Sequence, residues 1–284
     1  MSVKLITDST ADIPSDIARA LGIRVVPLYV RFGEEVYRDG VDLSPEDFYR
    51  KLVASKTLPT TSTVSAGEFA SVYDDVARDT DEILCIVISS ELSATYQAAL
   101  QGRELMETKS CRVEVTDSRL LVMALGLVVI AAAREAQRGT GLDEVMRVAH
   151  SAISRVRVRM VFDTLEYARK GGRIGRAQAF LGSLLSLKPV LTVSDGVAVP
   201  VARERTRSKA IEHLRRFAVS CGRIEDMAVE YTTTAEEAVA LAESLDPVFP
   251  RERSHVSCIG AVMGTHLGPG ALGVAVLKSV SSNP

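Results

Sequence analysis

The stretch Glu82-Ile-Leu-Cys-Ile-Val-Ile-Ser89 indicates the fold class of this chain of 284 residues. It is apolar without interruption between its two polar ends, whereas a half-buried strand alternates apolar and polar residues. A strand that is apolar on both sides is buried on both faces, which is typical of a parallel sheet covered by helices. We therefore expect an α/β fold with this strand inside a sheet.

Strand-type and helix-type segments alternate on both sides of this stretch, as in parallel α/β proteins. The apolar run Leu120–Ala133 has about 14 residues, fewer than the ~20 that span a bilayer, and predicts a buried helix. Pro14, with Asp12 as N-cap, and Ser44-Pro45 predict helix starts. The other expected elements before residue 160 are strands over Val3–Thr7, Ile23–Val30 and Arg112–Val115, and helices over Ala66–Arg78, Leu92–Met106, Leu121–Arg138 and Leu142–Arg155.

The pattern changes near residue 160, where we place a boundary between a lobe of residues 1–160 and a lobe of residues 161–284. Each lobe is expected to be a mainly parallel sheet with flanking helices. In the second lobe, Ser194-Asp195-Gly196 predicts a hairpin. Ala177–Leu187 predicts an apolar helix that ends before Pro189, either buried in the core or facing an apolar ligand. Its small residues Gly182 and Ser183 leave room for an acyl chain.

Composition excludes several functional classes. The formal net charge of -2 gives no reason to expect a nucleic-acid partner. The N-terminus runs directly into a strand pattern, which predicts a cytoplasmic protein without a signal peptide or transmembrane segment, and leaves transient contact with a membrane surface open. The four cysteines form no C-x-x-C pair, so we expect reduced thiols, no metal site and no cofactor.

Hydroxyl-rich clusters follow several of the expected strands. In sheets of this class, ligands bind at the strand ends, and hydroxyls with helix N-termini suit a carboxylate or phosphate. Each cluster alone is explained by helix capping, but five in one chain favour an anion site. The clusters are Asp8-Ser9-Thr10, Thr60-Thr61-Ser62-Thr63, Ser89-Ser90-Glu91-Leu92-Ser93, Thr116-Asp117-Ser118 and Gly264-Thr265-His266.

Two glycine-containing stretches carry further polar groups. Gly260–Gly270 predicts a rigid turn that brings His266 to a ligand, where its imidazole could donate to a carboxylate. The basic stretch Arg169–Arg176 is explained either by a helix C-cap or by contact with an anion or partner. The dinucleotide motif G-x-G-x-x-G after the first strand and the phosphate-loop motif are missing, so nucleotide binding lacks its usual sequence signals.

Taken together, these motifs resemble the DegV family of bacterial fatty-acid-binding proteins, in the same order and over essentially the whole chain. The matching stretches are Asp8-Ser9-Thr10-Ala11-Asp12, Ser89–Gln97, Val115–Arg119, Leu165–Gly175 and Gly264–Gly270.

The resemblance implies a two-lobed fold with one long-chain fatty acid in a tunnel between the lobes. It implies a non-catalytic carrier that presents the fatty acid to a fatty acid kinase for phosphorylation on its carboxylate. The acyl phosphate then feeds phospholipid synthesis. The ligand-binding residues of the family fall on Thr61, Ser62, Ser93, Thr265 and His266. Arg173 falls on the arginine of the basic turn and is a candidate for kinase docking or for the ligand network.

The chain departs from the family pattern at two places. The family motif Thr-Ser-Gln-Pro-Ser reads Thr61-Ser62-Thr63-Val64-Ser65 here, which keeps the hydroxyl pair and alters the loop. Ala94 stands where glycine is common.

Two other functions remain open from the residues alone. Ser93, His266 and Asp8 could form a hydrolase triad, although the Gly-x-Ser-x-Gly elbow is missing. A partner-binding module without ligand is the other alternative. Ester turnover that is lost in Ser93→Ala would identify the hydrolase, and a denatured protein that releases no lipid would favour the module.

Overall fold

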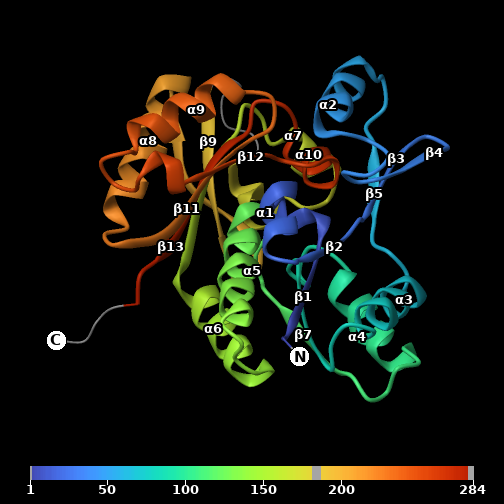
Figure 1. The fold of residues 1–284 in the computed structure, drawn as a ribbon. Coiled ribbons are helices and arrows are strands. Elements are labelled where there is room, and N and C mark those ends of the chain that lie inside the picture. Colours follow the sequence, from blue (N-terminus) through green and yellow to red (C-terminus); the bar gives the residue numbers. More distant parts are fainter. Residues whose placement is uncertain (1, 181–186, 281–284) are drawn as a thin grey trace.

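The computed structural model describes residues 2–180 and 187–280, and it has two main sheets with helices between them and on their outer faces (Figure 1). The predicted α/β class is confirmed. The first sheet is parallel throughout, and the stretch that begins at Glu82 lies inside it as predicted. Its strands, in spatial order, are β2 (Arg24–Val26), β1 (Lys4–Asp8), β6 (Glu82–Val87) and β7 (Arg112–Asp117).

Helices α3 (Ala66–Val76) and α4 (Thr95–Leu105) cover the outer face of the first sheet. A capping box begins α3: the Ser65 hydroxyl accepts from Glu68 N, and the Glu68 carboxylate accepts from Ser65 N at 2.8 Å. This pair satisfies two backbone donors that a helix start leaves free, so the helix begins where the sequence predicts.

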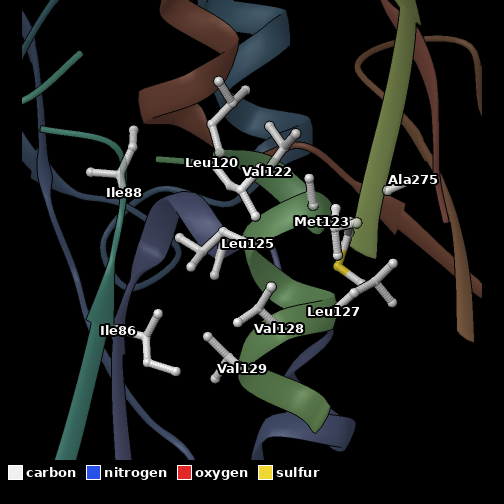
Figure 2. Packing of buried hydrophobic residues seen from close by; sticks show 14 of the residues in the cluster. Ile86, Ile88, Leu120, Val122, Met123, Leu125, Leu127, Val128, Val129 and Ala275 are labelled. Atoms are coloured by element: carbon white, nitrogen blue, oxygen red, sulfur yellow. The ribbon is translucent and has the colours of Figure 1, made fainter. Parts of the chain in front are cut away.

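Helices α5 (Val122–Gln137) and α6 (Leu142–Arg155) form the layer between the sheets. Figure 2 shows Leu125 and Val129 pointing toward Ile86 of β6 and Ile88 just after it, and Leu127 pointing the other way. Because α5 contacts a sheet on both sides, nearly all its residues are buried, which explains its continuous apolar run.

The second sheet differs from the prediction of a mainly parallel arrangement. Of its neighbouring strands in the described residues, only β11 and β12 run parallel. The predicted hairpin at Asp195-Gly196 is confirmed and makes two neighbours antiparallel, and the last strand inserts between two earlier ones and opposes both. The order is β10 (Val197–Glu204), β9 (Lys188–Ser194), β8 (Val156–Val161), β13 (Leu272–Lys278), β11 (Ile224–Tyr231) and β12 (His255–Cys258).

The two faces of the second sheet are set by alternation along its strands. In β8, Val158 and Met160 belong to the central core, whereas the Arg159 guanidinium lies 4.9 Å from the ring of Phe217. The predicted boundary near residue 160 falls within this strand and stays a prediction. Helices α8 (Arg207–Ser220) and α9 (Ala235–Ser244) cover the outer face, and η3 (Arg251–Arg253) precedes β12.

A small third sheet and several short helices complete the described chain. The sheet orders β4 (Glu35–Arg38), β3 (Tyr29–Phe32) and β5 (Thr60–Ser62), and α2 (Pro45–Ala54) lies beside it with Ser44 as its confirmed N-cap. The other short helices include η1 (Ser9–Ala11), α1 (Ser15–Ala20), α7 (Glu166–Lys170) and α10 (Ala261–Leu267). No helix in the described ranges is long and apolar enough to cross a membrane.

Three local predictions differ from the structure. The predicted strand Ile23–Val30 divides into β2 and β3, which lie in different sheets, at Pro27, a residue without a backbone donor. Asp12 does not cap α1, because its carboxylate accepts from Gly260 N at 2.7 Å instead. The start of the predicted helix Ala177–Leu187 belongs to the 3-10 helix η2 (Gly175–Phe180). Residues 181–186, with Gly182 and Ser183, lie outside the described residues.

Candidate functional site

A cavity of about 330 Å³ lies between the carboxyl ends of the first sheet and the inner face of the second. Thr10 and Ile88, which follow β1 and β6, line it from one side. Val158, Met160 and Leu191 line it from the other side, together with residues of α7, α10 and β10. The edge where parallel strands end is the usual place for a ligand in this class of fold.

Most of the cavity wall is apolar, and a group of polar residues lines it beside β5 and α10. We call the group Thr61, Ser62, Thr63, Ser93, Arg173 and His266 the polar end. The structure thus brings five of the six residues predicted from the sequence to one cavity. The exception is Thr265, whose hydroxyl donates to Ala261 O at 2.9 Å within its own helix and does not line the cavity.

His266 lies on a short helix, α10 (Ala261–Leu267), so the prediction of a turn at this point was wrong. Glycines are weak helix formers, but tertiary contacts hold this helix in place. The Asp39 carboxylate accepts from Ala261 N at 2.8 Å, and the Tyr49 hydroxyl donates to Ile259 O at 2.9 Å. A Cβ on Gly264 would come within 2.5 Å of the Tyr49 hydroxyl, so this close packing requires glycine.

The imidazole of His266 is held between Thr61 and Gly171. Its Nε2 lies 2.9 Å from the Thr61 hydroxyl, and its buried Nδ1 has no hydrogen-bond partner among the described residues. A Cβ on Gly171 would lie 2.3 Å from Nδ1, so the ring packs directly on the backbone there. Burial lowers the pKa of His266 to about 4, and the Arg173 guanidinium contributes in the same direction.

These contacts indicate which nitrogen of the neutral ring carries the proton. A proton on Nδ1 would be a buried donor without an acceptor, whereas a proton on Nε2 is donated to Thr61. In this second arrangement the Thr61 hydroxyl accepts from the ring and is free to donate its own proton. The pair can therefore donate a hydrogen bond to an anion in the cavity.

Ser93 and Arg173 lie where the polar end approaches the surface. The Ser93 hydroxyl is 2.8 Å from the Thr95 hydroxyl at the start of α4. Arg173 is exposed, and its guanidinium donates to Leu92 O at 3.2 Å and to Gly171 O at 2.8 Å. Ser62 is also exposed. The arginine thus joins the loop after β6 to the turn that packs on His266.

Three further lining hydroxyls were not assigned individually as site residues: Thr10 and Thr63, which belong to predicted hydroxyl clusters, and Thr192, which does not. Thr10 donates to Asp8, and Thr192 donates to Val158 O at 2.8 Å, so both have protein partners. The spacing of Thr61 and Thr63, two residues apart in extended chain, was a signal that both could face one side.

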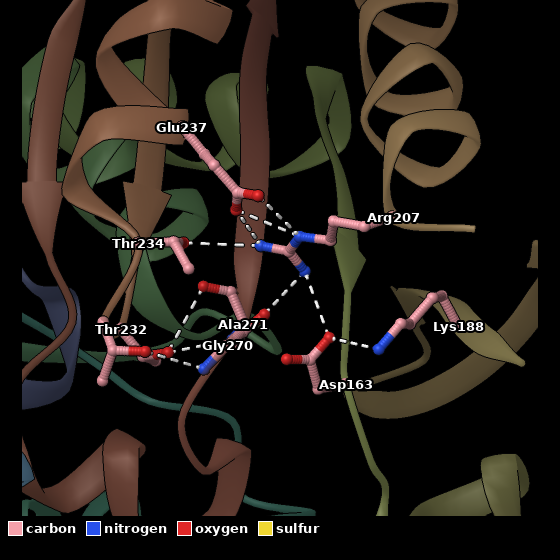
Figure 3. Close-up of polar contacts among 9 residues, drawn as sticks. Asp163, Lys188, Arg207, Thr232, Thr234, Glu237, Gly270 and Ala271 are labelled. Carbon is pink, nitrogen blue, oxygen red and sulfur yellow. Dashed lines mark hydrogen bonds and ion pairs between the residues drawn. The ribbon is translucent and has the colours of Figure 1, made fainter. Parts of the chain in front are cut away.

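An ion-pair network connects the ends of three strands of the second sheet (Figure 3). Arg207 donates to Gly270 O at 2.7 Å, just before β13, and pairs with Glu237 of α9. Asp163, just after β8, lies 3.7 Å from Arg207 and 2.8 Å from Lys188, which begins β9. Arg207 and Asp163 together therefore link the ends of β8, β9 and β13.

The hydrogen bonds of a Ser93–His266–Asp8 triad are not formed. His266 pairs with Thr61, and Ser93 pairs with Thr95. The buried Asp8 carboxylate accepts from Ile88 N at 2.8 Å and from Thr10, and burial raises its pKa. Among the described residues, no group of three or more His, Cys, Asp and Glu side chains could hold a metal ion.

The fold and the cavity define an α/β protein with an internal, mainly apolar binding space. Hydroxyls and a neutral imidazole line the end of this space that approaches the protein surface. A family model described as "Uncharacterised protein, DegV family" matches residues 2–279. The chain belongs to the DegV family, as its motifs indicated.

Curated relatives and solved structures agree with this assignment. The chain is 34% identical to Protein DegV of Bacillus subtilis over 278 residues, which cover 96% of this chain and 98% of the relative. A structure from Thermus thermophilus, described as fatty acid binding of a DegV family protein, superposes with a TM-score of 0.90 at 34% identity and covers 98% of this chain and all of that one. The structure of DegV from Bacillus subtilis, described as a fatty acid binding protein, gives 0.86 at 33% identity, with the same coverage.

Proposed function

We propose that this protein binds one long-chain fatty acid in the cavity, with the carboxylate at the polar end, and presents it to a fatty acid kinase. The observation that carries the proposal is the division of the cavity into an apolar wall and a polar end that holds Thr61, Ser93 and His266. The descriptions of the Thermus and Bacillus relatives as fatty acid binding support the same ligand class.

The chemistry of each part of the cavity fits one part of such a ligand. Burying an acyl chain contributes ~0.8 kcal/mol per methylene before the costs of ordering and association, so the wall supplies most of the affinity. A carboxylate loses its hydration when it enters the protein, and hydroxyl and imidazole donors offset that cost. The neutral state of His266 fits a donor role through Thr61 rather than an ion pair.

Presentation to a kinase is supported by the position of the polar end. Because Ser62 and Arg173 are exposed, a carboxylate held beside them would be within reach of a second protein. The kinase would form the acyl phosphate, and this chain would act as a non-catalytic carrier in the cytoplasm without a cofactor.

Native mass spectrometry of the freshly purified protein, followed by denaturation and lipid identification, tests fatty acid binding. We expect one fatty acid per chain. A protein that neither carries lipid nor takes up added palmitate would refute the proposal.

Two activity assays then separate a carrier from an enzyme. With a fatty acid kinase and ATP, we expect acyl phosphate to form only when the loaded protein is present. Alone, the protein should not hydrolyse a chromogenic acyl ester. Turnover that disappears in Ser93→Ala would instead make it an acyl hydrolase.

A further inference from the structure

We propose that the tip of the β9–β10 hairpin and two turns of the first sheet form a clasp, which closes the cavity over a bound fatty acid and opens when the ligand enters or leaves. The proposal rests on the proposed function and adds a step of ligand exchange at the same cavity. The clasp consists of residues 89–91 after β6, residues 118–120 after β7 and residues 194–197 at the hairpin tip.

Two side chains from the turns of the first sheet reach across to the backbone of the hairpin. The buried Ser89 hydroxyl donates to Gly196 O at 2.8 Å, and the Arg119 guanidinium donates to Asp195 O at 2.7 Å. The Glu91 carboxylate lies 3.5 Å from the same guanidinium. Because both hydrogen bonds join a side chain to a backbone oxygen, they can break without disturbing the strand pairing of either sheet.

Each half of the clasp is held together by its own contacts. On one side, the Asp117 carboxylate accepts from Ser90 N at 3.1 Å, from the Ser90 hydroxyl at 2.6 Å and from Arg119 N at 2.9 Å, so it ties the two turns together. On the other side, the pairing of Val197 with Ser194 closes the hairpin. The halves can therefore separate as two preformed units.

All three segments of the clasp border the cavity. Ile88 and Leu92 flank the first turn, Leu121 follows the second turn, and the cross-strand pair Val193 and Ala198 flanks the hairpin tip; all five residues line the cavity. Their side chains are apolar, so the clasp lies beside a part of the cavity that suits an alkyl chain. Separation of the two halves would open the wall at this point.

The backbone of the clasp is constrained on both sides of the contact. Arg119 has a φ of 54°, in the left-handed region that residues other than glycine, asparagine and aspartate rarely adopt. A Cβ on Gly196 would lie 2.5 Å from the Ser89 hydroxyl oxygen, so the closed contact requires glycine at the hairpin tip. Strained residues that surrounding contacts hold in place cluster at ligand clamps and switch segments, which favours a clamp over a passive surface contact.

The experiment compares ligand exchange in wild type, Arg119→Met, Ser89→Ala and Arg147→Met by stopped-flow fluorescence with cis-parinaric acid, a fluorescent long-chain fatty acid. Association is followed after mixing the acid with unliganded protein, and dissociation after adding excess palmitate to loaded protein. Methionine keeps the apolar stem of arginine and removes its donors. Arg147 pairs with Glu144 within α6 and does not line the cavity, so Arg147→Met is the matched control.

We expect Arg119→Met and Ser89→Ala to raise the association and dissociation rate constants together, by ~2- to 13-fold for the loss of one hydrogen bond. The dissociation constant should change by less than about twofold, because a clasp that is closed in both the free and the bound protein speeds entry and exit equally when it is weakened. Arg147→Met should exchange its ligand at wild-type rates.

The outcomes distinguish the clasp from the function on which it rests. Wild-type exchange rates in both clasp variants, or faster dissociation without faster association, would overturn the clasp and leave fatty acid binding standing. If Ser89→Ala does not fold, because the serine is buried, the exposed Arg119 decides the question alone. A wild-type protein that binds neither cis-parinaric acid nor palmitate would overturn the proposed function, and the clasp with it.

Discussion

The wall and the polar end of the cavity are built in different ways. Many of the apolar residues of the wall, such as Met160 and Leu191 of the second sheet, also belong to the central hydrophobic core around α5. The polar end consists of residues from short elements and loops: β5, the segment after β6, the turn after α7, and α10. The wall is therefore part of what folds the protein, whereas the head-group contacts can change without removing the core.

The largest effect should come from the wall. Leu191→Ala removes a side chain that is 4% exposed and extends an existing cavity, so we expect the free energy of unfolding to fall by ~2–5 kcal/mol. Urea denaturation measures this change. Val201→Ala, at a residue 39% exposed on the neighbouring strand β10, is the control and should change stability by about 0.5 kcal/mol or less. Equal losses of unfolding free energy in Leu191→Ala and Val201→Ala would contradict the view that the wall is part of the hydrophobic core.

His266 is the polar-end residue through which pH should affect folding. Its pKa of about 4 in the folded protein lies below the ~6.5 of an unfolded chain, so the unfolded state binds more protons between these values. The contribution of the neutral His266 to the free energy of unfolding is therefore fully present above pH 6.5. It is lost as the pH falls toward 4, by at most about 3 kcal/mol.

The comparison with His266→Gln isolates this contribution. Burial raises the pKa values of the Asp8 and Asp39 carboxyls and raises that of Glu230 to about 8, so these groups act in the opposite direction. These carboxyls are present in both proteins, so their effects cancel when the two are compared. The unfolding free energy of wild type relative to His266→Gln should therefore decrease when the pH is lowered from 7 to 4.5. Parallel pH profiles would contradict a neutral, buried His266.

The sequence predicted the wall and the polar end unequally. The buried strand at Glu82, the apolar helix α5, the cap at Ser44 and the start of α3 at Ala66 follow from local periodicity and hydrogen bonding, and they were found. The antiparallel order of the second sheet was missed because β13 pairs with β8, a contact between distant segments that no local pattern specifies.

The candidate site was found largely through the family motifs, since single hydroxyl clusters also serve as caps. Those motifs named Thr61, Ser93 and His266, which line the cavity, but also Thr265, whose hydroxyl stays within α10. Thr63 belongs to a hydroxyl cluster that the sequence predicts, but the absence of a partner for its hydroxyl becomes visible only once the chain is folded.

Gly171 tests whether the polar end depends on exact placement of the imidazole. Its backbone has right-handed helical angles that alanine adopts freely, so the cost of Gly171→Ala comes from the Cβ that would lie 2.3 Å from His266 Nδ1. Displacing the ring breaks its contact with Thr61, and we expect ~10- to 100-fold weaker fatty acid binding. Gly67→Ala, where a Cβ meets nothing closer than 3.9 Å, should bind as wild type.

The smallest effects should come from single hydroxyls, and their order tests the proton arrangement inferred for His266. Thr61→Val removes a donor to the ligand and leaves His266 Nε2 without an acceptor, whereas Ser93→Ala leaves the Thr95 hydroxyl, which can turn to another acceptor. A net hydrogen bond of about 0.5–1.5 kcal/mol corresponds to ~2- to 13-fold in affinity, and Thr61→Val should lie at the upper end. Fatty acid titration and acyl phosphate formation with a kinase should both show the larger decrease for Thr61→Val, and only Ser93→Ala should leave the melting temperature nearly unchanged. If Ser93→Ala has the larger effect, the ring does not donate to Thr61, and the serine is the main carboxylate contact.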